Sequence, residues 1–268
     1  MPIDIDYHPY QGSVEKTKTY LTFTPLPPLN HWVQVFWQLN VPDGQYYYRS
    51  VPDNCVDLII DLASPEEAFI VTPFSSSKVF EMTGPVSYFG IRFRILGHQG
   101  LISDPLGAWN KPDNFISANE VLPGYILSTV FNGANKKLQF HNRCKYFSKV
   151  LLGSLQHNKI DSRLARYIRH CQQNITSNID LSEKQCSEFG VSARQLRRLS
   201  RLYLGLSPRE FAKVFRFQKT LHVMNTENCS SAWARHYYDQ PHFIRDFKSM
   251  SGITPKEFRS SSVLYNTG

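Results

Sequence analysis

In the C-terminal part of the chain, four arginines fall within a stretch of eight residues, a spacing that suits contacts with nucleic acids. They are Arg194, Arg197, Arg198 and Arg201. A guanidinium releases counterions when it meets a phosphate, and it can chelate O6 and N7 of guanine in the major groove. On one helix these charges repel each other unless an anion faces them. Each arginine therefore has three interpretations: base recognition, a phosphate contact, or a solvated side chain.

Catalytic chemistry has no comparable support. The phosphate-binding, dinucleotide-binding, zinc-protease and serine-hydrolase motifs are all absent. Asp53, Asp57 and Asp61 are four residues apart, a spacing more typical of a rim or turn than of an acid–base pair. His141 and Cys144 could supply two metal ligands, but no second pair accompanies them. We therefore expect no catalytic residue, no metal site and no cofactor.

A small-molecule pocket would use aromatic side chains and a charged group of the N-terminal part. Packing in the core or at its rim is the alternative for every candidate. The candidates are Trp32, Trp37, Tyr46, Tyr48 and Arg92.

The charge of the 268-residue chain is divided unevenly. The formal net charge is +8, made up of −1 in residues 1–154 and +9 in residues 155–268. A near-neutral half joined to a basic half is typical of a nucleic-acid-binding domain attached to another domain. No apolar run approaches the roughly 18–20 residues that span a membrane, and the acidic start is unlike a signal peptide. The five scattered cysteines fit a reducing cytoplasm.

An internal repeat places two basic helices in equivalent positions. Gly205-Leu-Ser-Pro-Arg-Glu-Phe211 matches Gly252-Ile-Thr-Pro-Lys-Glu-Phe258 at an offset of 47 residues. In each unit a short helix, a tight turn and a basic amphipathic helix are expected, which is the helix-turn-helix pattern. The first basic helix buries Leu196, Leu199 and Tyr203. The second buries Phe243, Phe247 and Met250 and leaves outside its apolar stripe Gln240, Ile244, Arg245 and Lys248.

Capping signals fix three helix starts in this half. Ser192 with Gln195, Ser207 with Glu210 and Thr254 with Glu257 have the spacing of capping boxes, and Pro follows the last two caps directly. The helix that joins the units, from residue 208 to about 224, would be roughly 25–30 Å long. That length is close to one turn of DNA, about 34 Å, so both basic helices could enter successive major grooves.

The N-terminal part is predicted to be rich in β-structure. Short strands are expected at residues 33–39, 45–51, 55–62, 68–72 and 87–95, separated by breaks such as 41–44 and 83–85. This spacing suggests a barrel or sandwich. Phe89, Ile91 and Phe93 should face the core. From about residue 105 the pattern becomes helical, with an apolar stripe over residues 140–155 that either packs on its own domain or forms a subunit contact.

Residues from about 160 to 260 resemble the DNA-binding domain of AraC/XylS-family transcription regulators. The second unit carries the longer match, Tyr-Tyr-Asp-Gln-Pro-His-Phe-Ile-Arg-Asp-Phe-Lys-Ser-Met-Ser-Gly-Ile-Thr-Pro-Lys-Glu-Phe-Arg over residues 237–259. The first carries Gly-Val-Ser-Ala-Arg-Gln-Leu-Arg-Arg-Leu-Ser over 190–200. The resemblance implies two helix-turn-helix units joined by a long helix. It places base-facing positions at Arg194, Arg197, Arg198, Gln240, Pro241, Ile244 and Arg245.

The second unit departs from the family pattern. His236 stands where the family has the turn glycine, which would strain the turn if its φ were positive. Ser230 and Ser231 replace an Ile-type residue, so the first helix should pack less tightly. Because Pro241 and Ile244 cannot donate hydrogen bonds from their side chains, we expect unit one to read sequence. Unit two then adds phosphate contacts and an apolar contact with a thymine methyl.

Taken together, the sequence predicts an α+β protein of two domains. Residues 1–157 form a β-rich, barrel- or sandwich-like sensor domain with C-terminal helices, and residues 158–268 form an all-α DNA-binding domain with units at about 180–204 and 229–251. Residues 50–60 and 89–93 resemble an uncharacterised domain found in front of some AraC-type regulators, whose N-terminal domains usually bind an effector or dimerise. The expected partners are double-stranded DNA, a small-molecule effector, RNA polymerase and a second copy, with no membrane. The alternative is a ligand- or partner-binding module whose DNA-binding half is weak or needs a partner.

Overall fold

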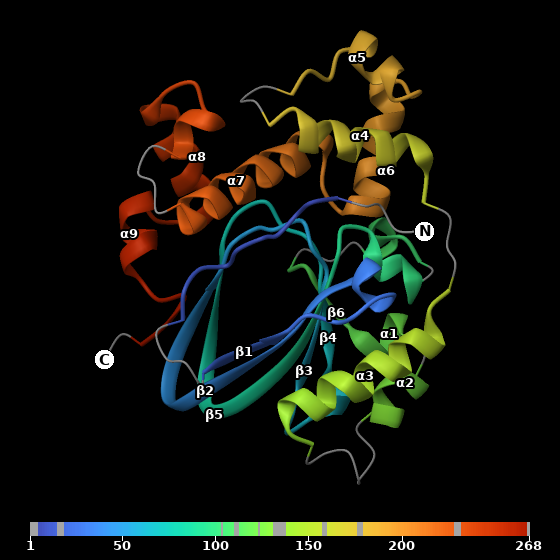
Figure 1. The fold of residues 1–268 in the computed structure, drawn as a ribbon, viewed down its shortest axis with the longest axis vertical. Coiled ribbons are helices and arrows are strands. Elements are labelled where there is room, and N and C mark those ends of the chain that lie inside the picture. Colours follow the sequence, from blue (N-terminus) through green and yellow to red (C-terminus); the bar gives the residue numbers. More distant parts are fainter. Residues whose placement is uncertain are drawn as a thin grey trace.

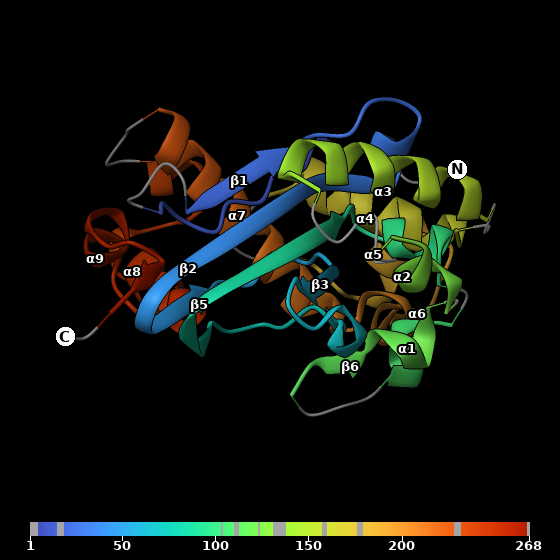
Figure 2. The same ribbon diagram turned by 90° about the horizontal axis from the view of Figure 1, so that it is seen from below.

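The protein, described by a computed structural model, combines a β-sheet with two groups of helices (Figure 1). The described residues are 5–14, 19–102, 104–109, 113–122, 124–130, 138–156, 160–175, 179–227 and 232–266. The expected boundary between residues 157 and 158, and also Ser230 and Ser231, lie outside them. Helices α4 to α9 lie together along one side of the sheet, and α1 to α3 cover it elsewhere (Figures 1 and 2).

The strands form one antiparallel sheet in the order β1-β2-β5-β3-β4-β6, with β7 pairing β2 beyond β1. The two long strands, β2 and β5, pair along most of their length. The strand bounds are Tyr20–Phe23 for β1, Val33–Ser50 for β2, Asp57–Asp61 for β3, Phe69–Val71 for β4, Lys78–Phe93 for β5, Phe115–Ser117 for β6 and Leu264–Tyr265 for β7.

The breaks predicted at residues 41–44 and 83–85 were wrong, because β2 and β5 run through both of them. The ladder absorbs these residues in a bulge, where its register shifts between Val41 and Gly44. Glycine makes the close approach possible: a Cβ on Gly84 would lie 1.7 Å from the carbonyl oxygen of Pro42. Turn-forming residues therefore mark a bulge here, and two predicted short strands merge into one.

The alternation predicted for β5 is confirmed. Phe89, Ile91 and Phe93 are fully buried against α3 (Phe140–Ser154) and its neighbours α1 (Ala118–Val121) and α2 (Tyr125–Val130). The apolar stripe of α3 lies in the same core, and the ring of Phe147 stacks on Phe89 at 5.0 Å between centroids. The stripe thus packs on the sheet of its own chain, as the first of the two alternatives predicts.

The C-terminal half is helical and follows the predicted order. All three predicted capping boxes are present, at Ser192, Ser207 and Thr254. Within the described residues, the first helix of unit two is a single turn of 3₁₀-helix, η5 (Ala232–Arg235). The remaining bounds are Ser162–Gln173 for α4, Glu183–Glu188 for α5, Ala193–Leu204 for α6, Pro208–Thr226 for α7, Gln240–Ser251 for α8 and Pro255–Ser260 for α9.

Both ends of the chain cross between the halves. The N-terminal strap, residues 5–14, lies along α7, where the ring of Tyr7 stacks on Phe215 at 4.6 Å and the amide of Tyr10 donates to Gln218. The C-terminal tail, residues 263–266, returns to the sheet and pairs β7 with Tyr47 and Tyr48 of β2. The sheet and the helices α1 to α3, within residues 19–156, are called the sheet domain below. A single apolar core contains residues from the strap, from the sheet domain and from the helices α4 to α9. Within the described ranges, no helix has the length and apolar character needed to cross a membrane.

Candidate nucleic-acid interface and ligand cavity

Helix α6 presents its arginines to solvent on a face that the fold holds in place. Leu196 and Leu199 are buried, and the Ser192 cap satisfies the amide of Gln195. Ser200 is also buried and donates to the carbonyl of Leu206, which ties the end of α6 to the following turn. The four basic side chains on the opposite face are all exposed: Arg194, Arg197, Arg198 and Arg201.

Helix α8 is held in a comparable way. Phe243 and Phe247 are buried, and Asp239 caps the helix by accepting from the amide of His242. Asp246 faces α7, where Arg216 and Lys213 lie 2.7 and 3.1 Å from its carboxylate oxygens. The predicted contact positions lie on the free face and are all exposed: Gln240, Pro241, Ile244, Arg245 and Lys248.

The turn of unit two is not strained by His236, because its φ is not positive. The corresponding turn of unit one does use a glycine, Gly190, with a φ of 76°. His236 has a packing role: Nδ1 lies 2.9 Å from Oγ1 of Thr220 on α7. Burial, with the nearby cations Arg235 and Arg216, lowers the pKa of His236 to about 4.

The sheet domain contacts the C-terminal ends of both basic helices. Gly107, in the 3₁₀-turn η4 (Leu106–Trp109), packs on the backbone of Leu202 in α6. At α8, the amide of Ser77 donates to the carbonyl of Met250 at 2.7 Å, and Nη1 of Arg49 donates to the carbonyl of Ser251 at 3.4 Å. A cation at this end suits the helix dipole. The sheet domain thus holds each basic helix by the end away from its predicted base-facing residues.

A cavity of about 230 Å³ lies on the face of the sheet opposite α3. We call it the sheet cavity; its walls come from all six strands β1 to β6, and eight of the 18 lining residues are aromatic. Gly90 has no side chain, which leaves room for the Trp37 ring: a Cβ there would lie 1.9 Å from it. Three of the predicted pocket residues line the cavity, namely Trp37, Tyr48 and Arg92.

A buried ion cluster lies at one side of this cavity. Nε of Arg92 donates to both carboxylate oxygens of Asp57, at 3.1 and 3.2 Å, and Nη2 lies 3.3 Å from Asp53. The Trp37 indole donates to Asp57 at 2.9 Å, and Gln11 of the strap donates to Asp53 at 2.7 Å. One guanidinium therefore serves two carboxylates, all with side chains about nine-tenths buried.

Burial and neighbouring charge pull the pKa values of this cluster in opposite directions. Burial raises the pKa of Asp57 in spite of its contact with Arg92. Burial also disfavours the Arg92 charge, but the two carboxylates outweigh it and hold the pKa of Arg92 well above its usual value. Cys55, which also lines the cavity, has its thiol pKa raised by burial, so this thiol is not an activated nucleophile.

The segment that carries the two aspartates also contacts the helix that joins the DNA-binding units. Asn54 donates to the carbonyl of Phe211, and Gln218 donates to the carbonyl of Pro52 at 2.7 Å. Gln218 is 1% exposed, so both of its hydrogen bonds are shielded from water. We call residues 51–57 the hinge segment, since it connects the sheet cavity directly to α7.

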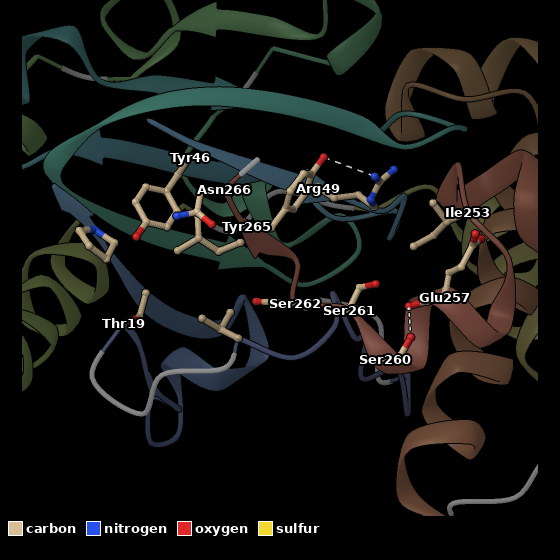
Figure 3. A pocket seen from close by; sticks show the side chains of 13 residues that line it. Thr19, Tyr46, Arg49, Ile253, Glu257, Ser260, Ser261, Ser262, Tyr265 and Asn266 are labelled. Carbon is tan, nitrogen blue, oxygen red and sulfur yellow. Dashed lines mark hydrogen bonds between the residues drawn. The ribbon is translucent and has the colours of Figure 1, made fainter. Parts of the chain in front are cut away.

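Two of the predicted pocket residues lie elsewhere, which corrects that prediction. Trp32 packs its ring against Gly100, because the chain bends sharply through η3 (Gly97–Gly100) at this point. Tyr46 lines a separate cavity of about 530 Å³ beside the tail, together with Arg49 and Tyr265 (Figure 3). Tyr46 shares a face of β2 with Tyr48, because the register between them is regular, but it lies two residues nearer the bulge, beside the tail.

The other sequence candidates are not brought together. Cys144 is buried in the α3 core, while His141 meets the ring of Phe23 edge-on. Asp61 accepts from the amide of Ala63, away from the ion cluster. Across the described ranges, no group of three His, Cys, Asp or Glu side chains is placed to hold a metal ion.

Sequence reasoning missed the role of Asp53 and Asp57 as partners of Arg92. A signal was present, since Asp57 and Arg92 each interrupt an apolar strand and a buried charge requires a partner. The two residues are direct neighbours in the β3–β5 ladder. It also missed most of the aromatic lining, including Tyr20, Phe80 and Tyr88.

Two family models match separate stretches of the chain. Residues 185–261 match the family described as Helix-turn-helix domain, and residues 21–113 match a Domain of unknown function (DUF6597). No curated protein matches the sequence significantly.

Among solved structures, an apo variant of ToxT from Vibrio cholerae is 14% identical, with 95% of this chain and 96% of that chain covered and a TM-score of 0.43. Wild-type ToxT with a bound unsaturated fatty acid is also 14% identical, with 92% and 97% covered and a TM-score of 0.40. Likeness at this level carries no argument about function or ligand.

Proposed function

We propose that the protein is a DNA-binding transcription regulator of the AraC type, in which α6 and α8 enter successive major grooves of one site. The match of residues 185–261 to a helix-turn-helix domain supports this proposal. The exposed face of α6 supports this most directly, since it carries four exposed arginines opposite a buried apolar face. Arg194, Arg197 and Arg198 read base edges, while Arg201 and Lys248 contact phosphates.

Helix α8 has a different share of the recognition. Gln240 and Arg245 supply polar contacts, and Pro241 and Ile244 offer an apolar surface that fits a thymine methyl. Ile244 is 38% exposed, an unusual position for a large aliphatic side chain unless a partner covers it. The 19 residues of α7 set the separation of the two units at about 28 Å of helix.

The sheet domain, in this proposal, senses a small molecule in the sheet cavity. The hinge segment contributes Asp53, Cys55 and Asp57 to the cavity and binds α7 through Pro52 and Asn54. An occupant that shifts the hinge segment therefore changes how the sheet domain holds the DNA-binding units. RNA polymerase and a second copy of the chain remain proposed partners, in a cytoplasmic setting.

Footprinting combined with a salt series tests the DNA-binding proposal. The full chain should protect two adjacent major-groove segments, and its affinity should fall steeply with salt, by about 0.9 in log–log slope per neutralised phosphate. Lys248→Ala should lower this slope by about one and leave base preference unchanged. Protection of only one groove would contradict the role proposed for α8.

The coupling route can be tested without knowing the effector. Ile59→Phe adds bulk inside the sheet cavity and should mimic an occupant, shifting the affinity for the DNA site by about fivefold or more. In the double variant with Gln218→Ala the shift should become smaller, because the hinge segment loses one of its two hydrogen bonds to α7. Gel retardation with full-length proteins measures both effects.

Val79→Phe is the matched control for Ile59→Phe. It adds a phenyl ring to the same sheet at an exposed position outside the cavity, so DNA affinity should stay unchanged. If Ile59→Phe melts as a folded protein and binds DNA as the unmodified chain does, the proposed coupling is wrong.

A further inference from the structure

We propose that the occupant of the sheet cavity is a small organic cation, a protonated or quaternary amine carried on a flat or apolar body. This rests on the proposed function, in which the sheet cavity is the effector site. Three properties of the cavity lead to this class of ligand: its charge, the state of its guanidinium, and the chemistry of its walls.

The cavity is formally anionic. Two buried carboxylates line it, from Asp53 and Asp57, against the single guanidinium of Arg92. One negative charge of the buried ion cluster therefore has no cation of its own. A buried charge without a partner is unfavourable, and the raised pKa of Asp57 is one expression of that cost. A ligand cation would supply the missing charge.

An acidic ligand, by contrast, would find no advantage in Arg92. The guanidinium is held by Asp57 through Nε and by Asp53 through Nη2. The two aspartates already exceed its single positive charge, so a ligand carboxylate would bring a third negative charge into the same buried cluster. The arginine of this cavity thus organises the two aspartates and does not act as an anion receptor.

The walls suit a cation as well. Tyr20 and Trp37 lie nearly parallel with centroids 6.1 Å apart, and Tyr48, Phe80, Tyr88 and Phe115 add further rings to the lining. Aromatic faces attract ammonium groups, most strongly where water is excluded. The Trp37 ring is fixed by its hydrogen bond to Asp57, so an aromatic face lies beside one of the two carboxylates that share Arg92.

The volume limits the size of the ligand. About 230 Å³ is below the range of roughly 300–1,000 Å³ that accommodates drug-sized molecules. A single ring with a short amino-bearing arm fits this space better than a long chain does.

Three probes of nearly equal shape test the charge preference on the full-length protein. They are 2-phenylethylammonium, 2-phenylethanol and 3-phenylpropanoate, each titrated by calorimetry at pH 7.5. The ammonium probe should bind roughly tenfold or more tightly than the alcohol, and the carboxylate should bind most weakly. An alcohol or carboxylate that binds as tightly as the ammonium would overturn the proposal, and so would a failure of all three to bind.

Two cavity variants locate the binding. Asp57→Asn leaves Arg92 balanced by Asp53 alone, so the preference for the ammonium probe over the alcohol should fall by most of its value. Tyr88→Leu removes one ring without touching the ion cluster and should weaken the ammonium probe more than the alcohol. Asp61→Asn is the control, because it removes a carboxylate from the same strand outside the cavity.

The same samples report the proposed function separately. Gel retardation of the DNA site by each protein shows whether the regulator is intact, whatever the probes do. Suppose that DNA is retarded sequence-selectively but the carboxylate probe binds more tightly than the ammonium probe. The proposed function would then hold, and the proposal of a cationic ligand would be wrong. If the unmodified chain showed no sequence-selective retardation of DNA, the proposed function would be wrong.

Discussion

Arg198→Ala should cost about 1–3 kcal/mol of binding to the specific site, which is roughly 5- to 150-fold in affinity, and should relax base preference at one position. The side chain projects from an α6 whose start is capped and whose apolar face is buried. Little ordering is therefore needed before its guanidinium can chelate a guanine edge. Binding to a library of sites mutated at single base pairs measures the change.

The matched control is Arg169→Ala. Arg169 is also exposed, but it lies on α4, outside both basic helices. Its loss should weaken binding slightly and equally for all sequences, because it changes only the long-range charge. If Arg198→Ala gave the same uniform loss, Arg198 would be a phosphate contact and not a reader of bases.

Arg92→Met should destabilise the protein by about 3–5 kcal/mol, because it leaves two buried carboxylates without their shared cation. The methionine keeps much of the side-chain volume, so the loss reports on charge more than on packing. Chemical unfolding of the full chain measures it. The expected loss is large because the cluster also orders the Trp37 ring and the strap residue Gln11.

The loss in Arg92→Met should depend on pH in a defined direction. Burial already raises the folded-state pKa of Asp57, and removing the neighbouring cation raises it further. A group with a raised folded pKa contributes stability below its unfolded pKa, and that contribution is lost as pH rises through the folded value. The melting temperature of the variant should therefore lie less far below that of the unmodified protein at pH 5 than at pH 8.

Arg94→Met is the control for both effects. Arg94 follows Arg92 by two residues, but its guanidinium donates to the backbone carbonyl of Asn30 and not to a carboxylate. The loss of stability in Arg94→Met should be smaller than in Arg92→Met and nearly independent of pH. An Arg92→Met loss that did not vary between pH 5 and pH 8 would mean that the cluster carries no spare negative charge.

Local signals were read well from the sequence. The capping boxes at Ser192, Ser207 and Thr254 depend on side chains three residues apart, so they required nothing from the rest of the fold. The α3 helix and the core face of β5 follow from apolar periodicity alone. For the same reason the exposed arginines of α6 were assigned to the correct face.

Features that depend on distant partners were missed. Residues 41–44 look like a turn in isolation, and only the pairing with β5 keeps them in a strand. Strand β6 is three residues long and exists because β4 offers it an edge. The sheet cavity draws on all six strands β1 to β6, so no single stretch of sequence outlines it. Trp32 was misplaced because a bend intervenes, and Tyr46 was misplaced because the sheet cavity does not extend that far along β2.

The crossing of the strap and the tail bears on how such a regulator could be recombined. A single cut near residue 158 would separate the sheet domain from the helices in sequence, yet the strap would remain with the sheet domain and the tail with the helices. Each fragment would then carry a segment whose contacts are made by the other fragment. Joining this DNA reader to a different sensor requires the strap and the β7-pairing stretch of β2 to be transplanted with it. The module that can be exchanged is thus defined by contacts and is discontinuous along the chain.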